Sequence, residues 1–268
     1  MGQLDEAKEY LLLNLKLIQD HYGKNSKDLI PIYTNLSSAY NKSRDYEKAI
    51  AYSKQAVVLA EEQYGINHPQ THLAILNLGI TYHDGLDISN AKKYYEKAKP
   101  YLDTLGVSKS FLISICQRIT QIYYIEKNFE EALFYIKKTS DLAQDSNDPV
   151  LLLRMKTLEG DILEKLSRDE EALASYQSTV DIVKQIKTDN YYIGPEALDR
   201  IGQIHLAHKR YSEAIKAYED LVKLVEENKD YDRSLLQEYF EKLEQIHATL
   251  GNKSEAEKYN KLSKGKFN

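Results

Sequence analysis

The chain has 268 residues, of which 42 % are hydrophobic and 29 % are charged, a composition typical of folded soluble proteins and unlike that of disordered ones. Its formal charge of −5, from 36 basic and 41 acidic residues, gives no electrostatic reason to expect nucleic acid as a partner. No apolar run reaches the ~20 residues that a membrane-spanning helix needs, so we expect no membrane insertion.

Glycine, proline and cysteine contents narrow the fold and the compartment. Eleven Gly and five Pro are few for an all-β protein, in which every turn needs them, so a helix-rich fold is favoured. The opening MGQLDEAKEY has neither the basic nor the apolar region of a secretory signal. The one cysteine, Cys116, cannot form an internal disulfide, which fits a reducing compartment. A cytoplasmic location is therefore expected.

A short segment centred on alanine recurs seven times along the chain, which indicates an internal repeat. Its copies read LDEAKEYL, YEKAIAYS, ISNAKKYY, FEEALFYI, DEEALASY, YSEAIKAY and KSEAEKYN. Successive copies are 42, 42, 41, 40, 42 and 42 residues apart, and their alanines are Ala7, Ala49, Ala91, Ala132, Ala172, Ala214 and Ala256. A second element precedes six of these copies in register, so each repeat contains two elements.

The pattern resembles the tetratricopeptide repeat, whose two antiparallel helices carry W-x2-L-G-x2-Y and then aromatic-x2-A-x3-aromatic-x2-A. In the best match, AILNLGITYHDGLDISNAKKYYEKA, the signature positions hold Leu78, Gly79, Tyr82, Ala91, Tyr95 and Ala98. The resemblance covers almost the whole chain but weakens later, where Glu159 replaces the expected Leu and Glu244 replaces Gly. The period near 42, longer than the usual 34, resembles the kinesin-light-chain-like variety.

This resemblance implies an all-α fold, a right-handed α–α superhelix of about 13 helices in antiparallel pairs that forms a single solenoid over 1–268. Because one hairpin cannot bury its apolar face alone, neighbouring pairs are expected to share a continuous core. Along the chain we expect an unpaired second helix of a partial repeat and then six helical pairs, at 3–22 and at 27–64, 69–104, 108–145, 148–188, 191–229 and 231–265.

The first expected helix has no first helix before it in the repeat register. Its apolar run would then lack one packing neighbour; the run contains Leu11, Leu12, Leu13, Leu15 and Leu17. We expect either that upstream repeats are missing or that a partner covers this helix; self-association of the chain through it is a further alternative. A natural single-helix cap is the alternative.

No sequence motif indicates catalysis. The chain has no Gly-rich phosphate loop, no nucleophile elbow, no H-E-x-x-H and no Cys pair. Cys116 falls at a buried position of its repeat, which predicts a core thiol rather than a nucleophile. His205 and His208 could share a helix face as metal ligands, but no third ligand is evident. We therefore expect that the protein is not an enzyme and that it binds no cofactor and no metal.

The resemblance also implies which surface binds. In this family the first helix of each pair lines the concave face, and ligands contact positions offset from the buried Leu, Gly and Tyr. Carried over by register, these positions are Thr34, Asn35, Ser38, Asn41, Leu76, Asn77, Ile80, His83, Gln117, Arg118, Gln121, Tyr124, Arg154, Thr157, Asp161, Lys165, Asp199, Arg200 and Gln203, followed by Glu241, Lys242 and Gln245. Because Asn and Gln pair with both groups of a peptide backbone, this composition favours polypeptide; a merely solvated face is the alternative.

The sequence thus predicts a non-catalytic protein–protein interaction scaffold that binds a peptide or partner helix in its concave groove. The alternatives are a ligand-sensing regulatory segment of a larger bacterial signalling or protease-type protein, and a self-assembling adaptor. Tetratricopeptide domains that grip chaperone carboxylates use five Lys, Asn and Arg positions, of which only Asn77 and Arg118 match. Without the missing cations a buried carboxylate lacks its charge partners, so such capture is not expected.

Overall fold

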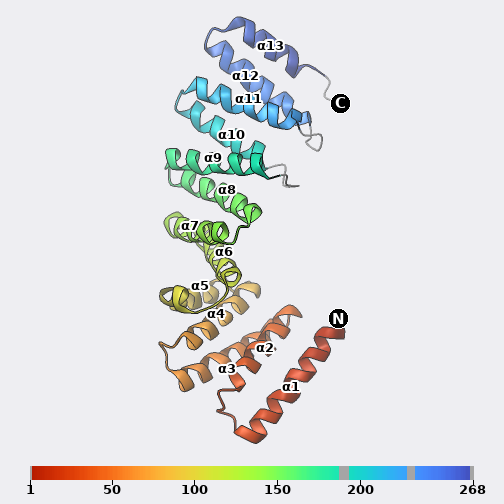
Figure 1. The fold of residues 1–268 in the computed structure, drawn as a ribbon, viewed down its shortest axis with the longest axis vertical. Coiled ribbons are helices and arrows are strands. Elements are labelled where there is room, and N and C mark those ends of the chain that lie inside the picture. The colour runs from red at the N-terminus through yellow and green to blue at the C-terminus, as the bar shows by residue number, and fades with distance from the viewer. Residues whose placement is uncertain (1, 187–192, 228–232, 266–268) are drawn as a thin grey trace. The chain divides into compact units, whose positions relative to one another are not determined.

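The computed structural model describes residues 2–186, 193–227 and 233–265, and over these ranges it contains thirteen α-helices, two short 3-10 helices and no strand (Figure 1). The predicted all-α fold class is confirmed. The predicted pair ends at 188, 191, 229 and 231 lie outside the described residues. The chain divides into two compact units, Met1–Ile125 and Glu126–Asn268, and the single solenoid over 1–268 stays a prediction.

The first unit is a stack of helical hairpins. Its helices are α1 (Gly2–Tyr22), α2 (Leu29–Lys42), α3 (Tyr46–Tyr64), α4 (Pro69–Asp84), α5 (Ile88–Ala98), the 3-10 helix η1 (Lys99–Thr104) and α6 (Lys109–Ile125). Helix α2 packs on α3 and α4 packs on α5, while α3 also packs on α4 and α1 packs on α2. In Figure 1 these helices follow one another from red at α1 to yellow at α6. Neighbours in sequence are therefore neighbours in space, as in a repeat protein.

The second unit continues the same plan. Its helices are α7 (Phe129–Asp145), α8 (Pro149–Lys165), α9 (Asp169–Gln185), α10 (Ile193–Ala207), α11 (Tyr211–Glu227), the 3-10 helix η2 (Arg233–Leu235), α12 (Leu236–Thr249) and α13 (Lys253–Ser263). The hairpins are α8 with α9, α10 with α11 and α12 with α13, and each hairpin packs on the next.

Several turns between consecutive helices share one local design. One residue adopts a left-handed conformation, with φ of 61° at Arg44, 63° at Leu86 and 60° at Lys127. The next residue is an Asp or Asn whose side chain accepts a backbone N–H three residues ahead, as Asp87 does from Asn90 at 3.1 Å. Such a cap satisfies a donor that the first helical turn leaves free. In α3, α5 and α7 the polar residue before the helix therefore fixes where the helix begins.

Small residues allow the two helices of a hairpin to approach closely. The repeat alanines of α3, α5, α7, α9 and α11 are fully buried; they are Ala49, Ala91, Ala132, Ala172 and Ala214. In three hairpins a glycine of the first helix lies under a tyrosine ring of the second helix; the pairs are Gly79–Tyr95, Gly160–Tyr176 and Gly202–Tyr218. A Cβ at these glycines would lie 2.8, 2.5 and 2.5 Å from the ring, closer than packed carbon atoms can be. The tyrosine therefore requires the glycine.

We predict that Gly160→Ala lowers the free energy of unfolding by about 1–3 kcal/mol, because its methyl group overlaps the Tyr176 ring. The loss outweighs the helix propensity that alanine gains. Gly85→Ala is the matched control, since its Cβ would meet its neighbours at an ordinary 3.4 Å. Chemical denaturation of both variants measures the difference, and equal stabilities would contradict the account.

His72 is buried in α4 with its ring stacked on Tyr101, and the ring centroids are 3.5 Å apart. Neither ring nitrogen hydrogen-bonds another residue within the described ranges. Burial lowers the pKa of His72, with the charge of Lys97 acting in the same direction. The folded state therefore holds this imidazole neutral.

It follows that His72 contributes stability that is fully present above its unfolded pKa, near 6.5, and is lost as the pH falls below that value. We expect the melting temperature to fall between pH 7.5 and 5.5, and to fall less in His72→Phe, which keeps the ring stacking. The protonation of this one group can change the free energy of unfolding by at most about 1.4 kcal/mol per pH unit. An unchanged slope in the variant would exclude His72 as the cause.

Candidate functional site

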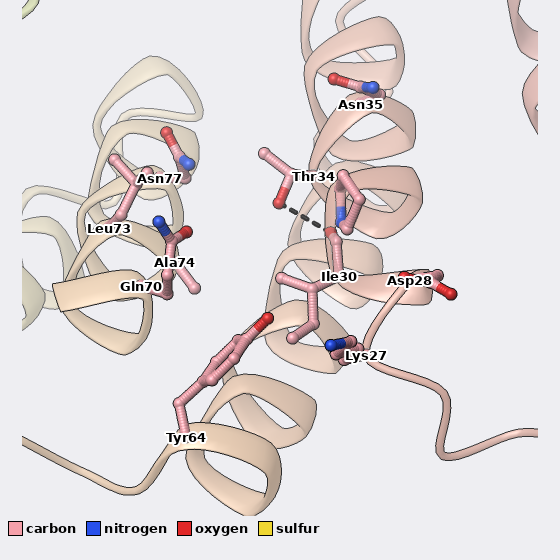
Figure 2. Close-up of a pocket in the computed structure, with 11 residues that line it drawn as sticks. Lys27, Asp28, Ile30, Thr34, Asn35, Tyr64, Gln70, Leu73, Ala74 and Asn77 are labelled. Carbon is pink, nitrogen blue, oxygen red and sulfur yellow. Dashed lines mark hydrogen bonds between the residues drawn. The ribbon is translucent and has the colours of Figure 1, made fainter. Parts of the chain in front are cut away.

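A cavity of about 370 Å³ lies between α2 and α4, the first helices of two successive hairpins. Figure 2 shows α2 on one side of it, α4 on the other and Tyr64, from the end of α3, near its base. It is lined by Lys27, Asp28, Ile30, Pro31, Thr34, Asn35, Tyr64, Gln70, Leu73, Ala74 and Asn77. Three predicted binding positions, Thr34, Asn35 and Asn77, are therefore brought together here.

Three side-chain amides line this cavity, Asn35 from α2 and Gln70 and Asn77 from α4 (Figure 2). None of them hydrogen-bonds another side chain in the part of the chain that the structure describes, so their donors and acceptors are open to a ligand. The Thr34 hydroxyl, by contrast, donates to the Ile30 carbonyl at 3.0 Å. Each free amide offers both N–H donors and a carbonyl acceptor, the complement of a peptide backbone.

The start of α4 is held firmly against the end of α3, which positions Gln70 and Tyr64. Pro69 opens α4, and His68 Nδ1 accepts the backbone N–H of Gln70 at 3.2 Å. The His68 ring stacks on Tyr64, with centroids 4.8 Å apart. The Thr71 hydroxyl lies 2.8 Å from the Gly65 carbonyl and 3.1 Å from the Ala60 carbonyl, at the end of α3. The cavity is thus preformed by packing around one loop.

A second polar cluster joins three first helices of the first unit. At the end of α4, Asp84 accepts a hydrogen bond from Asn41 Nδ2 of α2 at 2.6 Å and pairs with Arg118 Nη1 of α6 at 2.5 Å. Arg118 Nη1 also lies 2.9 Å from His83 Nδ1. Because arginine can only donate, His83 must accept at Nδ1 and carry its proton on Nε2. Burial, supported by the charge of Arg118, lowers the pKa of His83, which is consistent with this neutral tautomer.

In the second unit, similar clusters place a carboxylate of one first helix against a cation of the next. Glu164 of α8 lies 3.9 Å from Arg200 of α10, and the Tyr176 hydroxyl reaches Asp161 at 2.7 Å and Glu164 at 3.1 Å. Burial raises the pKa of Glu164. Likewise Asp199 of α10 accepts a hydrogen bond from Lys242 of α12 at 2.8 Å. Tyr176 reaches its carboxylates because its ring crosses over a glycine.

These ion pairs reduce the charge that the predicted concave-face positions, here called the strip, can offer a ligand. Arg118, Arg200 and Lys242 each have a carboxylate partner in the same unit, so their charge is already compensated. Leu76 is fully buried, so the prediction that it contacts a ligand is wrong: α4 packs on both α3 and α5, which cover more than one of its faces. The other positions are half-buried or exposed.

The exposures separate the predicted positions into two groups. The exposed ones are Asn35, Ser38, Gln121, Arg154, Lys165, Gln203, Glu241 and Gln245. The half-buried ones are Thr34, Asn41, Asn77, Ile80, His83, Gln117, Arg118, Tyr124, Thr157, Asp161, Asp199, Arg200 and Lys242. Sequence reasoning missed Lys27, Tyr64, Gln70 and Asp84, which stand at helix ends, outside the signature offsets. The sequence feature that could have revealed these residues is the pattern of capping and turn residues, which marks where helices begin and end.

Among the described residues no group of three or more His, Cys, Asp or Glu is arranged to hold a metal ion. None of the described helices combines the length and apolar character needed to cross a bilayer. Cys116 is buried. The polar lining of the α2–α4 cavity consists of the three amides together with Lys27, Asp28, Thr34 and Tyr64.

Family comparisons agree with this architecture. Two family models described as tetratricopeptide repeat match residues 28–101 and 195–228. These two segments of the chain are tetratricopeptide repeats. A repeat-containing protein from Cytophaga hutchinsonii superposes with a TM-score of 0.61 and 16 % identity, over 96 % of this chain and 88 % of that one. YrrB, a tetratricopeptide protein with an unusual peptide-binding site, superposes with a TM-score of 0.55 and 17 % identity, over 78 % and 90 %.

A curated relative matches only as part of a longer protein. The clustered mitochondria protein homolog of Brugia malayi is 25 % identical over 191 residues, which is 68 % of this chain and 13 % of that protein. The chain thus spans about an eighth of the length of that relative. The solved structures share less than 25 % identity with the chain and establish its fold. Tetratricopeptide repeats are protein-interaction scaffolds, and this chain is built as one.

We predict that the Asp84–Arg118 pair is energetically coupled. Each side chain is 27 % exposed, so removing either one leaves a poorly solvated partner. In a double-mutant cycle of Asp84→Ala and Arg118→Ala, we expect a coupling free energy of unfolding of about 1–2 kcal/mol. The exposed pair Arg168–Glu171 is the control, with an expected coupling below about 0.5 kcal/mol. Equal coupling in the two cycles would show that the first pair is merely a surface contact.

Proposed function

We propose that this protein is a non-catalytic scaffold that binds an extended peptide, or an extended segment of a partner protein, in the cavity between α2 and α4. The observation that carries this proposal is the set of three free amides, Asn35, Gln70 and Asn77, which face one cavity from two helices. Amides on opposite walls can pair with successive N–H and C=O groups of one extended chain.

The rest of the cavity suits a peptide side chain. Ile30, Leu73 and Ala74 supply an apolar wall on which an aliphatic side chain can lose contact with water. Lys27 and Asp28 stand together at one edge and carry opposite charges. The cavity therefore favours neither acidic nor basic peptides, and we infer that recognition rests on backbone pairing and one apolar side chain.

Preorganisation supports binding by these residues. Asn35 and Asn77 stand on helices, and the start of α4 is tied to the end of α3 through Thr71. Binding to a preformed cavity orders few receptor groups and so loses little free energy to conformational entropy. The fold shared with YrrB, whose peptide-binding site is described as unusual, is consistent with a peptide ligand.

The regulatory alternative, a segment that senses a ligand and passes the signal on, rests on the division of the chain into two compact units between α6 and α7. Such a segment would change its radius of gyration on binding a ligand, whereas a preformed scaffold would not. Small-angle scattering with and without a selected peptide distinguishes the two functions. The single, buried cysteine is in keeping with a cytoplasmic place of action for either.

To test peptide binding, a random decapeptide library displayed on phage is selected on the full chain, and the best peptide is titrated by calorimetry. We expect Asn35→Ala and Asn77→Ala each to weaken binding about tenfold, the cost of one lost amide pair. Gln63→Ala is the control, since Gln63 is an exposed amide of α3 outside the cavity and its loss should leave affinity unchanged. A selected peptide whose affinity is the same for all three variants would place the site elsewhere.

A further inference from the structure

Helix α1 presents an apolar stripe on the face that points away from α2. Tyr10 is 72 % exposed, Leu13 is 56 % exposed and Leu17 is 48 % exposed. Their spacing of three and four residues keeps them on one side of a helix. The opposite side meets α2, where Gln19 donates to the Tyr33 hydroxyl at 3.2 Å and Lys8 lies over the Tyr40 ring. Large apolar side chains gathered on one exposed face mark an interaction surface.

One edge of this stripe carries two opposite charges. Glu9 and Lys16 are seven residues apart, which places them two turns apart on the same edge of α1. Neither forms an ion pair with any residue that the structure describes. Lys8 differs, because it pairs with Asp5 of the same helix at 2.7 Å. The charges beside the stripe are therefore free to meet a partner.

We propose that two copies of the chain associate through α1, with the two helices antiparallel and the stripes of Tyr10, Leu13 and Leu17 in contact. In a twofold dimer each contact occurs twice: if residue i of one copy contacts residue j of the other, then residue j of the first copy contacts residue i of the second. With the axis near Leu12 and Leu13, Glu9 of each copy faces Lys16 of the other. Both charges lie about 5 Å along the helix from the axis, within reach of each other's long side chains.

Charge complementarity favours this orientation over a parallel one. In a parallel twofold pair the charged edges of the two copies would lie on opposite sides of the seam, so Glu9 and Lys16 would meet no opposite charge of the partner. The acidic residues Glu6 and Asp20 bound the stripe at its two ends, so the apolar seam extends over only about two turns. Such a short seam falls below the ~1,000 Å² of a stable interface, and we expect a weak, concentration-dependent dimer.

Sedimentation velocity of the full chain over a concentration series tests the dimer. We expect the wild type to shift from monomer toward dimer as concentration rises, and Leu13→Glu to remain monomeric at every concentration. Leu250→Glu is the matched control, because Leu250 is 43 % exposed outside α1, and it should associate like the wild type. Circular dichroism checks that both variants keep the helical content of the wild type.

Charge reversal tests the register independently of the apolar seam. Glu9→Lys and Lys16→Glu should each weaken self-association at least about tenfold, because each places like charges in contact. Mixing the two variants should restore association as a heterodimer, in which two lysines face two glutamates. A wild type that is monomeric throughout, a dimer that survives Leu13→Glu, or a mixture that fails to associate overturns the proposal. The proposal is also overturned if another protein binds the stripe while the chain alone stays monomeric.

Discussion

The close approach of the two helices within each hairpin is the constraint on which the rest of the structure depends. At Gly160 and Gly202 a tyrosine ring of the second helix lies so near the first helix that even a methyl group would collide with it. Fully buried alanines of the second helix, such as Ala172 and Ala214, likewise allow the two helices to approach closely. A larger residue at these places would push the helices apart and shift the spacing of the next hairpin, since each hairpin packs only on its neighbours.

That approach also determines what lies on the first helices. Because its ring crosses Gly160, Tyr176 can bring its hydroxyl to Asp161 and Glu164, on the far side of α8. Those carboxylates in turn lie near the cation of the following first helix, Arg200. The packing of the hairpin core and the charge pairing on the surface are therefore linked through a continuous series of contacts.

As a result, several charged side chains of the proposed binding surface are already paired within the protein. Arg118 is paired with Asp84, and Lys242 with Asp199, so a ligand carboxylate would have to displace an existing partner. Amides have no such competitor at the α2–α4 cavity, where Asn35 and Asn77 remain available. A neutral, backbone-directed mode of recognition is the chemistry that this distribution leaves open.

Much of this architecture could be predicted from the sequence, because the repeat makes every signature residue recur in register. Gly79, Tyr95 and Ala91 indicated the close-packed hairpin, and the tetratricopeptide resemblance placed Thr34, Asn35 and Asn77 on the strip that the cavity partly occupies. Only the tertiary structure showed that Leu76 is buried and that Asp84 accepts from Arg118. Periodicity determines which face of a helix a residue is on, whereas a partner 34 residues away depends on how two helices pack and where each one ends.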